Sequence, residues 1–333
     1  MGERSAQIVG WGTYVPERVL SNADLERIVD TSDDWITTRT GIKERRIAAP
    51  GESTSTMGSC AAERAIQKAG IKASDLDLII SASATPDYLF PATAGLIQQA
   101  VGANCGGFDL EAGCSSFVYG LVVARQMIAA GGYENILVVG AETLSRFMDY
   151  TDRATCVLFG DGAGAVVLQA CPKDYGIQAS ELGADGAGCE LIKLPAGGSA
   201  TPASEETVRA GDHFVHMAGN QVFKFATLTL GACAERVATK AGWKLHEIDL
   251  FIPHQANIRI IEAAQKRLDL PMDKIYVNVE RYGNTSSASV PIAMVEAIEA
   301  GLIRKDRNVV MVAFGVGLAW AGVAMRWGVE TGR

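Results

Sequence analysis

The 333-residue chain lacks the cysteine arrangement of a disulfide framework or of a zinc ribbon. Its seven cysteines are an odd number, and no two of them have C-x-x-C spacing. The chain also lacks an excess of positive charge, because 30 Lys and Arg stand against 38 Asp and Glu and give a net charge of −8. General nucleic-acid binding is therefore not expected, since such proteins present a basic face. A local basic patch for an acidic partner remains compatible with this balance.

Long apolar runs and histidines are also scarce. No stretch reaches the roughly 20 residues of a membrane-spanning helix without a glycine or a charge, and the first residues, MGERSAQIVGWG, lack the apolar core of a signal peptide. Together with the cysteine pattern, this predicts a cytoplasmic protein that does not enter a membrane. Of only four histidines, His213 and His216 are three residues apart without a third ligand, so we expect no metal site.

The sequence does contain an internal repeat. Residues 61–80 (AAERAIQKAGIKASDLDLII) and 233–252 (CAERVATKAGWKLHEIDLFI) are identical at half of their positions, and each copy predicts a helix, a glycine stop, a polar turn and a buried strand. We therefore expect an α/β protein with two βα-rich halves, residues 1–172 and 173–333, related by pseudo-twofold symmetry. Helices should cover largely parallel central sheets. The Gly-, Ala- and Ser-rich segment 183–205 predicts an excursion over the surface.

Cys114 lies in GFDLEAGCSSFVY, where a strand-like run is followed by apolar residues at helical spacing. The pattern predicts a strand-to-helix turn with Cys114 near the helix N-terminus. Unpaired N–H groups and the helix dipole favour an anion there, which would lower the pKa of the thiol. The same N–H groups could hold an oxyanion. A small, buried and inert cysteine is the alternative interpretation.

Two further polar residues follow predicted strands. His254 comes directly after the apolar run LFIP, where parallel sheets often place ligand sites, and a structural histidine is the alternative. Asn284 follows a predicted strand (IYVNV) and opens a predicted helix, so it could be a simple N-cap. The repeat, however, aligns Gly113 and Cys114 with Gly283 and Asn284. Pseudo-symmetry would then bring Cys114, His254 and Asn284 to one central cavity.

Five motifs together resemble those of the β-ketoacyl-[acyl-carrier-protein] synthase III family, a branch of the thiolase-fold condensing enzymes. The resemblance covers essentially the whole chain. It implies a thiolase-like fold with a layered α-β-α-β-α core, acyl-CoA and malonyl-acyl carrier protein as substrates, a homodimer, and no metal or redox cofactor. The motifs are SDDWITTRTGIKERRI (32–47), EAGCSSFVYGL (111–121), TDRATCVLFGDGAGA (151–165), PHQAN (253–257) and YGNTSSASVP (282–291).

The resemblance also implies a role for individual positions. Cys114 corresponds to the acylated nucleophile, and His254 and Asn284 to the pair that stabilises the enolate formed when the malonyl thioester loses CO₂. Family contacts with coenzyme A and pantetheine fall on Trp35, Arg39, Arg153, Asn220, Phe223, Ala256 and Asn257. Contacts with the acidic carrier protein fall on Lys224, Gln255, Arg259, Lys266 and Arg267. The substrate pocket is expected to involve Phe90, which closes it across the dimer interface, and Gly315, Val316 and Gly317.

The expected activity is the condensation of an acyl-CoA starter, with acetyl-CoA as the expected one, and malonyl-carrier protein to 3-ketoacyl-carrier protein. This step initiates type II fatty acid synthesis. A synthase III-like acyltransferase or condensing enzyme of a specialised acyl or polyketide pathway is the alternative. A cysteine hydrolase would consume no malonyl groups, and a non-catalytic carrier-binding protein would show no acylated cysteine. The chain departs from the family at Val316, where three consecutive glycines are common.

Overall fold

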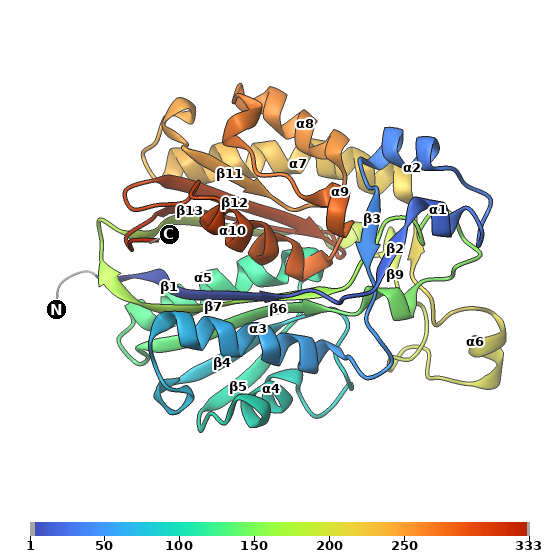
Figure 1. The fold of residues 1–333 in the computed structure, drawn as a ribbon, viewed down its shortest axis with the longest axis horizontal. Coiled ribbons are helices and arrows are strands. Elements are labelled where there is room, and N and C mark those ends of the chain that lie inside the picture. Colours follow the sequence, from blue (N-terminus) through green and yellow to red (C-terminus); the bar gives the residue numbers. More distant parts are fainter. Residues whose placement is uncertain (1–3, 332–333) are drawn as a thin grey trace.

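Two mixed β-sheets lie one above the other in the computed structural model, which describes residues 4–331 (Figure 1). The first sheet has the strand order β1-β7-β6-β4-β5. Its strands are β1 (Arg4–Tyr14), β4 (Leu78–Ala82), β5 (Gly106–Leu110), β6 (Asn135–Glu142) and β7 (Gly162–Pro172). The second has the order β11-β12-β13-β8. Its strands are β8 (Gly176–Ala184), β11 (Leu250–Pro253), β12 (Asn308–Gly315) and β13 (Ala319–Arg326).

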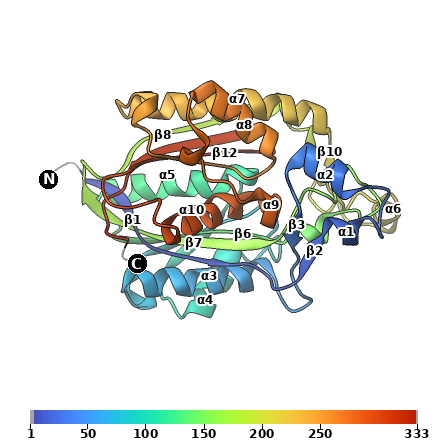
Figure 2. The ribbon, with the colours of Figure 1, turned by 45° about the horizontal axis from the view of Figure 1, so that its top comes forward.

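Helices complete a five-layer arrangement, which Figure 2 shows from the side. The outer face of the first sheet is covered by α3 (Thr54–Ala69) and α4 (Thr93–Val101). The middle layer, between the sheets, consists of α5 (Ser116–Ala129) and α10 (Ser289–Glu299). The outer face of the second sheet is covered by α7 (Gly219–Lys240), against which α8 (Ile258–Leu268) packs. The thiolase-like α-β-α-β-α architecture expected from the sequence is confirmed.

Shorter elements gather beyond one end of the sheets (Figure 1). Part of this region packs on a separate apolar cluster that includes Leu20, Leu25 and Ile36. The helices among them are α1 (Asn22–Leu25), α2 (Asp33–Thr40), α6 (Glu205–Arg209) and α9 (Val279–Tyr282). The strands are β2 (Val19–Ser21), which pairs with β3 (Glu44–Arg46), and β9 (Ile192–Lys193), which pairs with β10 (His216–Met217).

Burial on both faces explains the composition of the central elements. β6 and β12 are buried along almost their whole length, because helices cover both sides of each sheet. α5 and α10 are apolar on most sides, as helices between two sheets must be. Outer helices such as α3 instead carry one apolar face; Ser53 caps the start of α3, and Gly70 ends it with φ 69°.

The two sheets repeat one pairing scheme. In each sheet the last strand in chain order, β7 or β13, lies between two antiparallel neighbours. The strand that follows the repeated helix pairs in parallel: β4 after α3 pairs with β6, and β11 after α7 pairs with β12. β4 pairs with β5, and β11 forms a single parallel bridge, between Phe251 and Ile275, at the corresponding edge. The strands of the first sheet lie within residues 4–172 and those of the second within residues 176–326.

Two expectations about the fold need correction. The two large sheets are not largely parallel, because four of their seven strand pairs are antiparallel. The segment 143–161 after β6 and the short turn after β12 each lead to an antiparallel neighbour without an α-helical crossover. Segment 183–205 is also more than a surface excursion, since Ile192, Lys193 and Leu194 within it line the main cavity described below. Within residues 4–331, no helix has the length and apolarity needed to cross a membrane.

Candidate active site

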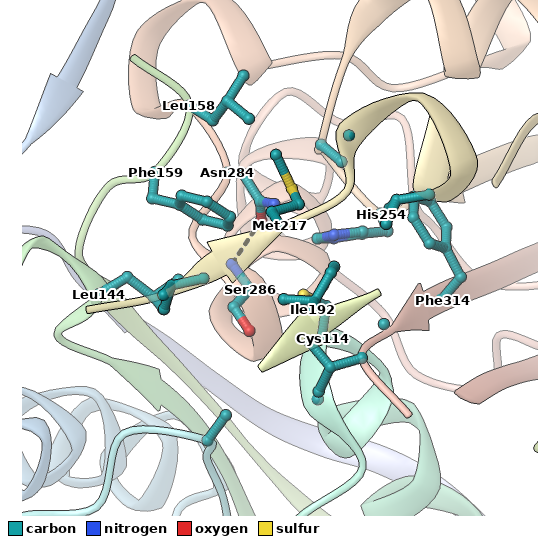
Figure 3. A pocket seen from close by; sticks show the side chains of 18 of the residues that line it. Cys114, Leu144, Leu158, Phe159, Ile192, Met217, His254, Asn284, Ser286 and Phe314 are labelled. Atoms are coloured by element: carbon teal, nitrogen blue, oxygen red, sulfur yellow. Dashed lines mark hydrogen bonds between the residues drawn. The ribbon is translucent and has the colours of Figure 1, made fainter. Parts of the chain in front are cut away.

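A cavity of about 300 Å³ lies between the two halves, and Cys114, His254 and Asn284 all line it (Figure 3). Its remaining wall is mostly apolar and includes side chains from β9, β10 and α7 and from the segment between β6 and β7. These apolar residues are Leu144, Phe147, Leu158, Phe159, Ile192, Leu194, Val215, Met217, Val222, Phe223, Ile260 and Phe314. A largely apolar cavity with a few convergent polar groups is typical of small-molecule sites.

Cys114 lies in the one-turn 3₁₀ helix Gly113–Ser115, which leads directly into α5. The predicted strand, turn and helix around it are therefore confirmed. The expected lowering of its pKa is not: burial raises the pKa of the thiol to about 12, and the neighbouring Ser286 hydroxyl only partly opposes this effect. Desolvation of the thiolate outweighs the N-terminal position on the helix.

His254 follows β11 and is buried, with only 1% of its surface exposed. Its Nδ1 is 2.5 Å from the hydroxyl of Ser289, the first residue of α10, while its Nε2 has no hydrogen-bond partner among the described residues. The ring of Phe314 packs edge-on against the imidazole, with centroids 5.1 Å apart. Burial lowers the pKa of His254 to about 3, so the imidazole is neutral at physiological pH.

Asn284 is fixed by its backbone and by its amide. Its N–H donates to Leu158 O at 2.8 Å, and its own carbonyl accepts from Gly160 N–H at 3.0 Å. Its Oδ1 accepts from the N–H of Ser286 at 2.8 Å, the bond drawn in Figure 3. The element before Asn284 is α9 and not the predicted strand, because only Ile275 of that segment bridges to the sheet.

Gly315 and Val316 bring a second backbone segment against the nucleophile turn. A Cβ on Gly315 would lie 2.4 Å from Cys114 N, and a Cβ on Gly113 would lie 2.7 Å from Val316 N. Neither position therefore tolerates a side chain. Gly113 and Gly283, which the repeat aligns, both have positive φ, 56° and 62°. The repeat thus places similar tight turns before Cys114 and Asn284.

Several residues that the sequence assigned to coenzyme A lie together beside Asn257, which lines the cavity. Two guanidinium groups lie over the Trp35 ring, that of Arg39 at 4.8 Å and that of Arg153 at 5.4 Å from its centroid. Asn257 lines the cavity and caps α8, and its amide also donates to Arg39 O at 3.0 Å. The cationic cluster at Trp35 is therefore joined directly to the cavity wall.

The other assigned residues divide into three sets. Phe223 and Ala256 line the cavity, whereas Asn220 is exposed in the first turn of α7 and is not among the described residues that line it. Gly315 and Val316 line the cavity, and Gly317 follows them. Phe90 is 85% exposed and does not contribute to the cavity of its own chain.

The residues assigned to carrier-protein contact lie on α7 and α8, with one exception. Lys224, Lys266 and Arg267 are exposed, and Arg259 is exposed with its guanidinium 5.3 Å from the Phe223 ring. Gln255 requires a correction, because it is only 1% exposed. Its amide donates to two buried backbone carbonyls, those of Pro253 and Tyr276, so it supports the loop after His254 instead of reaching the surface.

The sequence interpretation did not identify Ser286, Ser289 or Glu142. The two serines belong to the motif YGNTSSASVP, but nothing in the motif indicated which of its hydroxyls face His254 or the cavity. Glu142 ends an apolar strand, which could have attracted attention because an acidic residue is rare at a buried position.

Comparisons with known proteins agree with this geometry. Residues 108–186 match the family described as 3-oxoacyl-[acyl-carrier-protein (ACP)] synthase III, and residues 238–327 match its C-terminal domain. The chain is 52% identical to the β-ketoacyl-[acyl-carrier-protein] synthase III of Caldanaerobacter subterraneus over 97% of this chain and 98% of that protein.

Solved structures are similar over the same extent. The 3-oxoacyl-[acyl-carrier-protein] synthase III of Aquifex aeolicus superposes with a TM-score of 0.89 at 44% identity, covering 97% of this chain and 100% of that one. The priming β-ketosynthase of the R1128 polyketide biosynthetic pathway superposes with a TM-score of 0.90 at 34% identity, covering 99% of this chain and 98% of that one. The chain therefore belongs to the β-ketoacyl-[acyl-carrier-protein] synthase III family of condensing acyltransferases.

Proposed function

We propose that the chain catalyses the decarboxylative condensation of an acyl-CoA starter, acetyl-CoA in the first instance, with malonyl-acyl carrier protein. The product is 3-ketoacyl-carrier protein, and the reaction initiates fatty acid synthesis. One observation carries the proposal: a single apolar cavity holds a cysteine, a neutral buried histidine and an asparagine amide. The seven free cysteines fit a reducing cytoplasm, where these substrates occur.

Acyl transfer to Cys114 is the first step. The sulfur attacks the thioester carbonyl, and an acyl-enzyme forms as coenzyme A leaves, which divides the reaction into two easier steps. The closely packed N–H groups of Cys114 and Val316 are suited to hold the tetrahedral oxyanion, and one such donor typically contributes about 2.7–4 kcal/mol. The valine at 316 keeps its backbone N–H, so its difference from glycine does not remove the donor.

Decarboxylation and condensation follow on the same cysteine. In the His254 side chain, Nδ1 faces the Ser289 hydroxyl, so Nε2 can carry the proton and donate into the cavity. Because Oδ1 of Asn284 is occupied by Ser286 N–H, its NH₂ group is the second donor. Two neutral donors stabilise the enolate as CO₂ leaves, and the enolate carbon then attacks the acyl group on Cys114. These steps exchange acyl groups and protons, and they require no metal or redox cofactor.

Recognition of the two substrates is assigned to separate surfaces. Trp35, Arg39 and Arg153, beside the cavity-lining Asn257, present an aromatic face and positive charge suited to the nucleotide of coenzyme A. The pantetheine arm of either substrate would pass Phe223 and Asn257 to reach Cys114, with Ala256 and the exposed Asn220 beside that path. The acidic carrier protein would contact a basic surface on α7 and α8, formed by Lys224, Arg259, Lys266 and Arg267.

A homodimer is part of this proposal. Tyr88, Leu89 and Phe90 are 60%, 78% and 85% exposed, which is unusual for three consecutive apolar side chains. In a dimer, Phe90 would close the acyl end of the partner subunit's cavity. A priming role in a specialised pathway is the second candidate, because the R1128 priming β-ketosynthase shares this fold closely.

The test is a turnover assay with purified malonyl-carrier protein and a series of straight and branched acyl-CoA thioesters. We expect CO₂ release and 3-ketoacyl-carrier protein from acetyl-CoA, and neither product from Cys114→Ala. Turnover only with longer or branched starters would favour the specialised pathway. Thioester hydrolysis without consumption of malonyl groups would refute condensation.

A further inference from the structure

Glu142 is a carboxyl group that the steps proposed above do not use. It is the last residue of β6 and is 0% exposed. Its oxygens accept hydrogen bonds from neutral groups only: Ala84 N–H at 3.1 Å and the hydroxyls of Ser83 at 3.3 Å, Thr85 at 2.5 Å and Ser286 at 3.0 Å. Burial raises its pKa, which makes its carboxylate a better proton acceptor. Burial of a carboxyl without a cationic partner is costly, and such groups cluster at functional sites.

Ser286 connects this carboxyl to the cavity. Its hydroxyl donates to Glu142 at 3.0 Å, and Ser286 and Cys114 lie side by side in the cavity wall, so the oxygen of this hydroxyl is free to accept the thiol proton. The backbone of Ser286 has φ 50°, a conformation that residues with side chains rarely adopt. The other two described non-glycine residues with positive φ, Asp269 and Asp306, lie in exposed turns, whereas Ser286 is buried in the cavity wall. Strain at such a position indicates a functional requirement.

The other titratable groups of the cavity are less suited to accept the thiol proton. His254 faces the cavity from β11, but burial lowers its pKa to about 3. Glu111, in the turn before Cys114, is exposed, and its carboxylate accepts the N–H of Gly113 at 3.1 Å. Lys193 reaches the cavity from β9 as an ammonium group, which has no lone pair to accept a proton.

We propose that Glu142 is the proton acceptor for Cys114 and that the hydroxyl of Ser286 relays the proton between them. The inference rests on the acyl-Cys114 function proposed above. Ser286 lies beside Cys114 in the cavity wall, and Glu142 acts through Ser286.

The proton balance of this relay is closed over one catalytic cycle. As Sγ of Cys114 forms its bond to the acyl carbon, the S–H proton passes to Ser286 Oγ, and the hydroxyl proton of Ser286 passes to Glu142 Oε1. Coenzyme A leaves as the thiolate and takes a proton from water. Glu142 remains protonated while the cysteine is acylated. When formation of the C–C bond expels the Cys114 thiolate, the relay runs in reverse and returns the proton to sulfur.

The test is the single-turnover rate of acyl-enzyme formation with acetyl-CoA, measured by rapid quench between pH 5.5 and 9.5. We expect Glu142→Gln to lower this rate by about 10²-fold at pH 7, since a general base contributes about 10²–10⁴-fold. The remaining rate should increase in proportion to hydroxide. Ser286→Ala and Ser286→Gly should reduce the acylation rate to the same extent, because both remove the hydroxyl. Only the glycine variant also relieves the backbone strain, so an equal reduction assigns the effect to the hydroxyl.

Thr85→Val provides a readout that a purely structural role would not change. It removes the shortest hydrogen bond to Glu142, so the carboxylate loses a stabilising donor and its pKa rises. The midpoint of the rate profile should therefore move to higher pH while the relay stays intact. Infrared difference spectra of the wild-type chain should also gain a protonated-carboxyl band on acylation, and Glu142→Gln should lack it.

The outcomes separate failure of the relay from failure of the proposed function. Absence of any acyl-Cys114 in the wild-type chain would overturn the function itself. A wild-type acyl-enzyme combined with an unchanged rate and pH profile in Glu142→Gln would overturn only the relay. A lower rate in Glu142→Gln with the wild-type pH profile, together with a lower melting temperature, would assign Glu142 a structural role and also overturn the relay.

Discussion

Replacement of Asn284 by Asp should separate the two half-reactions. The substitution keeps the size of the side chain but exchanges the NH₂ donor for a carboxylate oxygen. In the structure Oδ1 already accepts Ser286 N–H at 2.8 Å, so the group that changes is the one that faces the cavity. Because Asn284 is only 8% exposed, solvent would screen the new charge poorly.

The expected loss can be bounded from the hydrogen bond alone. Removal of one donor to a developing oxyanion typically costs about 2.7–4 kcal/mol, which corresponds to about 10²–10³ in rate. The negative charge opposes the enolate further, so about 10²-fold is the minimum expected loss of malonyl decarboxylation. Acylation of Cys114 does not form this enolate, and its rate should change by less than about tenfold.

Rapid-quench acylation with acetyl-CoA and CO₂ release from malonyl-carrier protein measure the two steps on the same preparation. The acylation rate serves as the internal control, because a folding defect would reduce both rates. Equal losses in the two steps, or a loss confined to acylation, would refute the assignment of Asn284 to the enolate.

Three further predictions concern His254, Gly315 and Trp35. Burial lowers the pKa of His254 to about 3, so as the pH falls below about 6.5 the unfolded chain binds a proton on this residue before the folded chain does. Lowering the pH from 6.5 to 5 should therefore reduce the free energy of unfolding by about 1.6 kcal/mol more in the wild-type chain than in His254→Asn, which urea titration should detect. Parallel pH dependences of the two chains would contradict this. Gly315→Ala should reduce the acylation rate of Cys114 by at least about 10²-fold, because the added Cβ would lie 2.4 Å from Cys114 N. Gly106→Ala is the control and should acylate at the wild-type rate, because its Cβ would lie 3.8 Å from its nearest neighbour. Equal acylation rates in the two variants would contradict the close packing at Gly315. Trp35→Ala should raise KM for acyl-CoA about tenfold with little change in kcat, and a fall in kcat alone would place Trp35 outside coenzyme A binding.

Local sequence patterns were sufficient for the elements that carry the polar site residues. Helical periodicity after Cys114 and the apolar run before His254 predicted α5 and β11, because both patterns follow directly from burial of one element. The repeat supplied the long-range information. It aligned Gly113 with Gly283 and so placed Cys114 and Asn284 in equivalent turns, which precede α5 and α10.

Properties that depend on the tertiary environment could not be predicted in this way. The pKa of Cys114 was expected to fall, because helix position can be read from the sequence but the extent of desolvation cannot. Gln255 occurs in a motif beside His254, yet only the packed structure shows that its amide is committed to buried carbonyls. The cavity wall at Ile192 and Met217 comes from segments whose sequence has no regular period.

The central claim is that Cys114 carries the acyl group, and intact-protein mass spectrometry with peptide mapping tests it most directly. After incubation with acetyl-CoA, the account predicts one acetyl group on the peptide that contains Cys114, which malonyl-carrier protein then discharges as 3-ketoacyl product. Cys189, the exposed cysteine, should remain unmodified and is the internal control for non-specific acylation. An acetyl group on Cys189 or elsewhere with none on Cys114, or an adduct that malonyl-carrier protein does not discharge, would contradict the account.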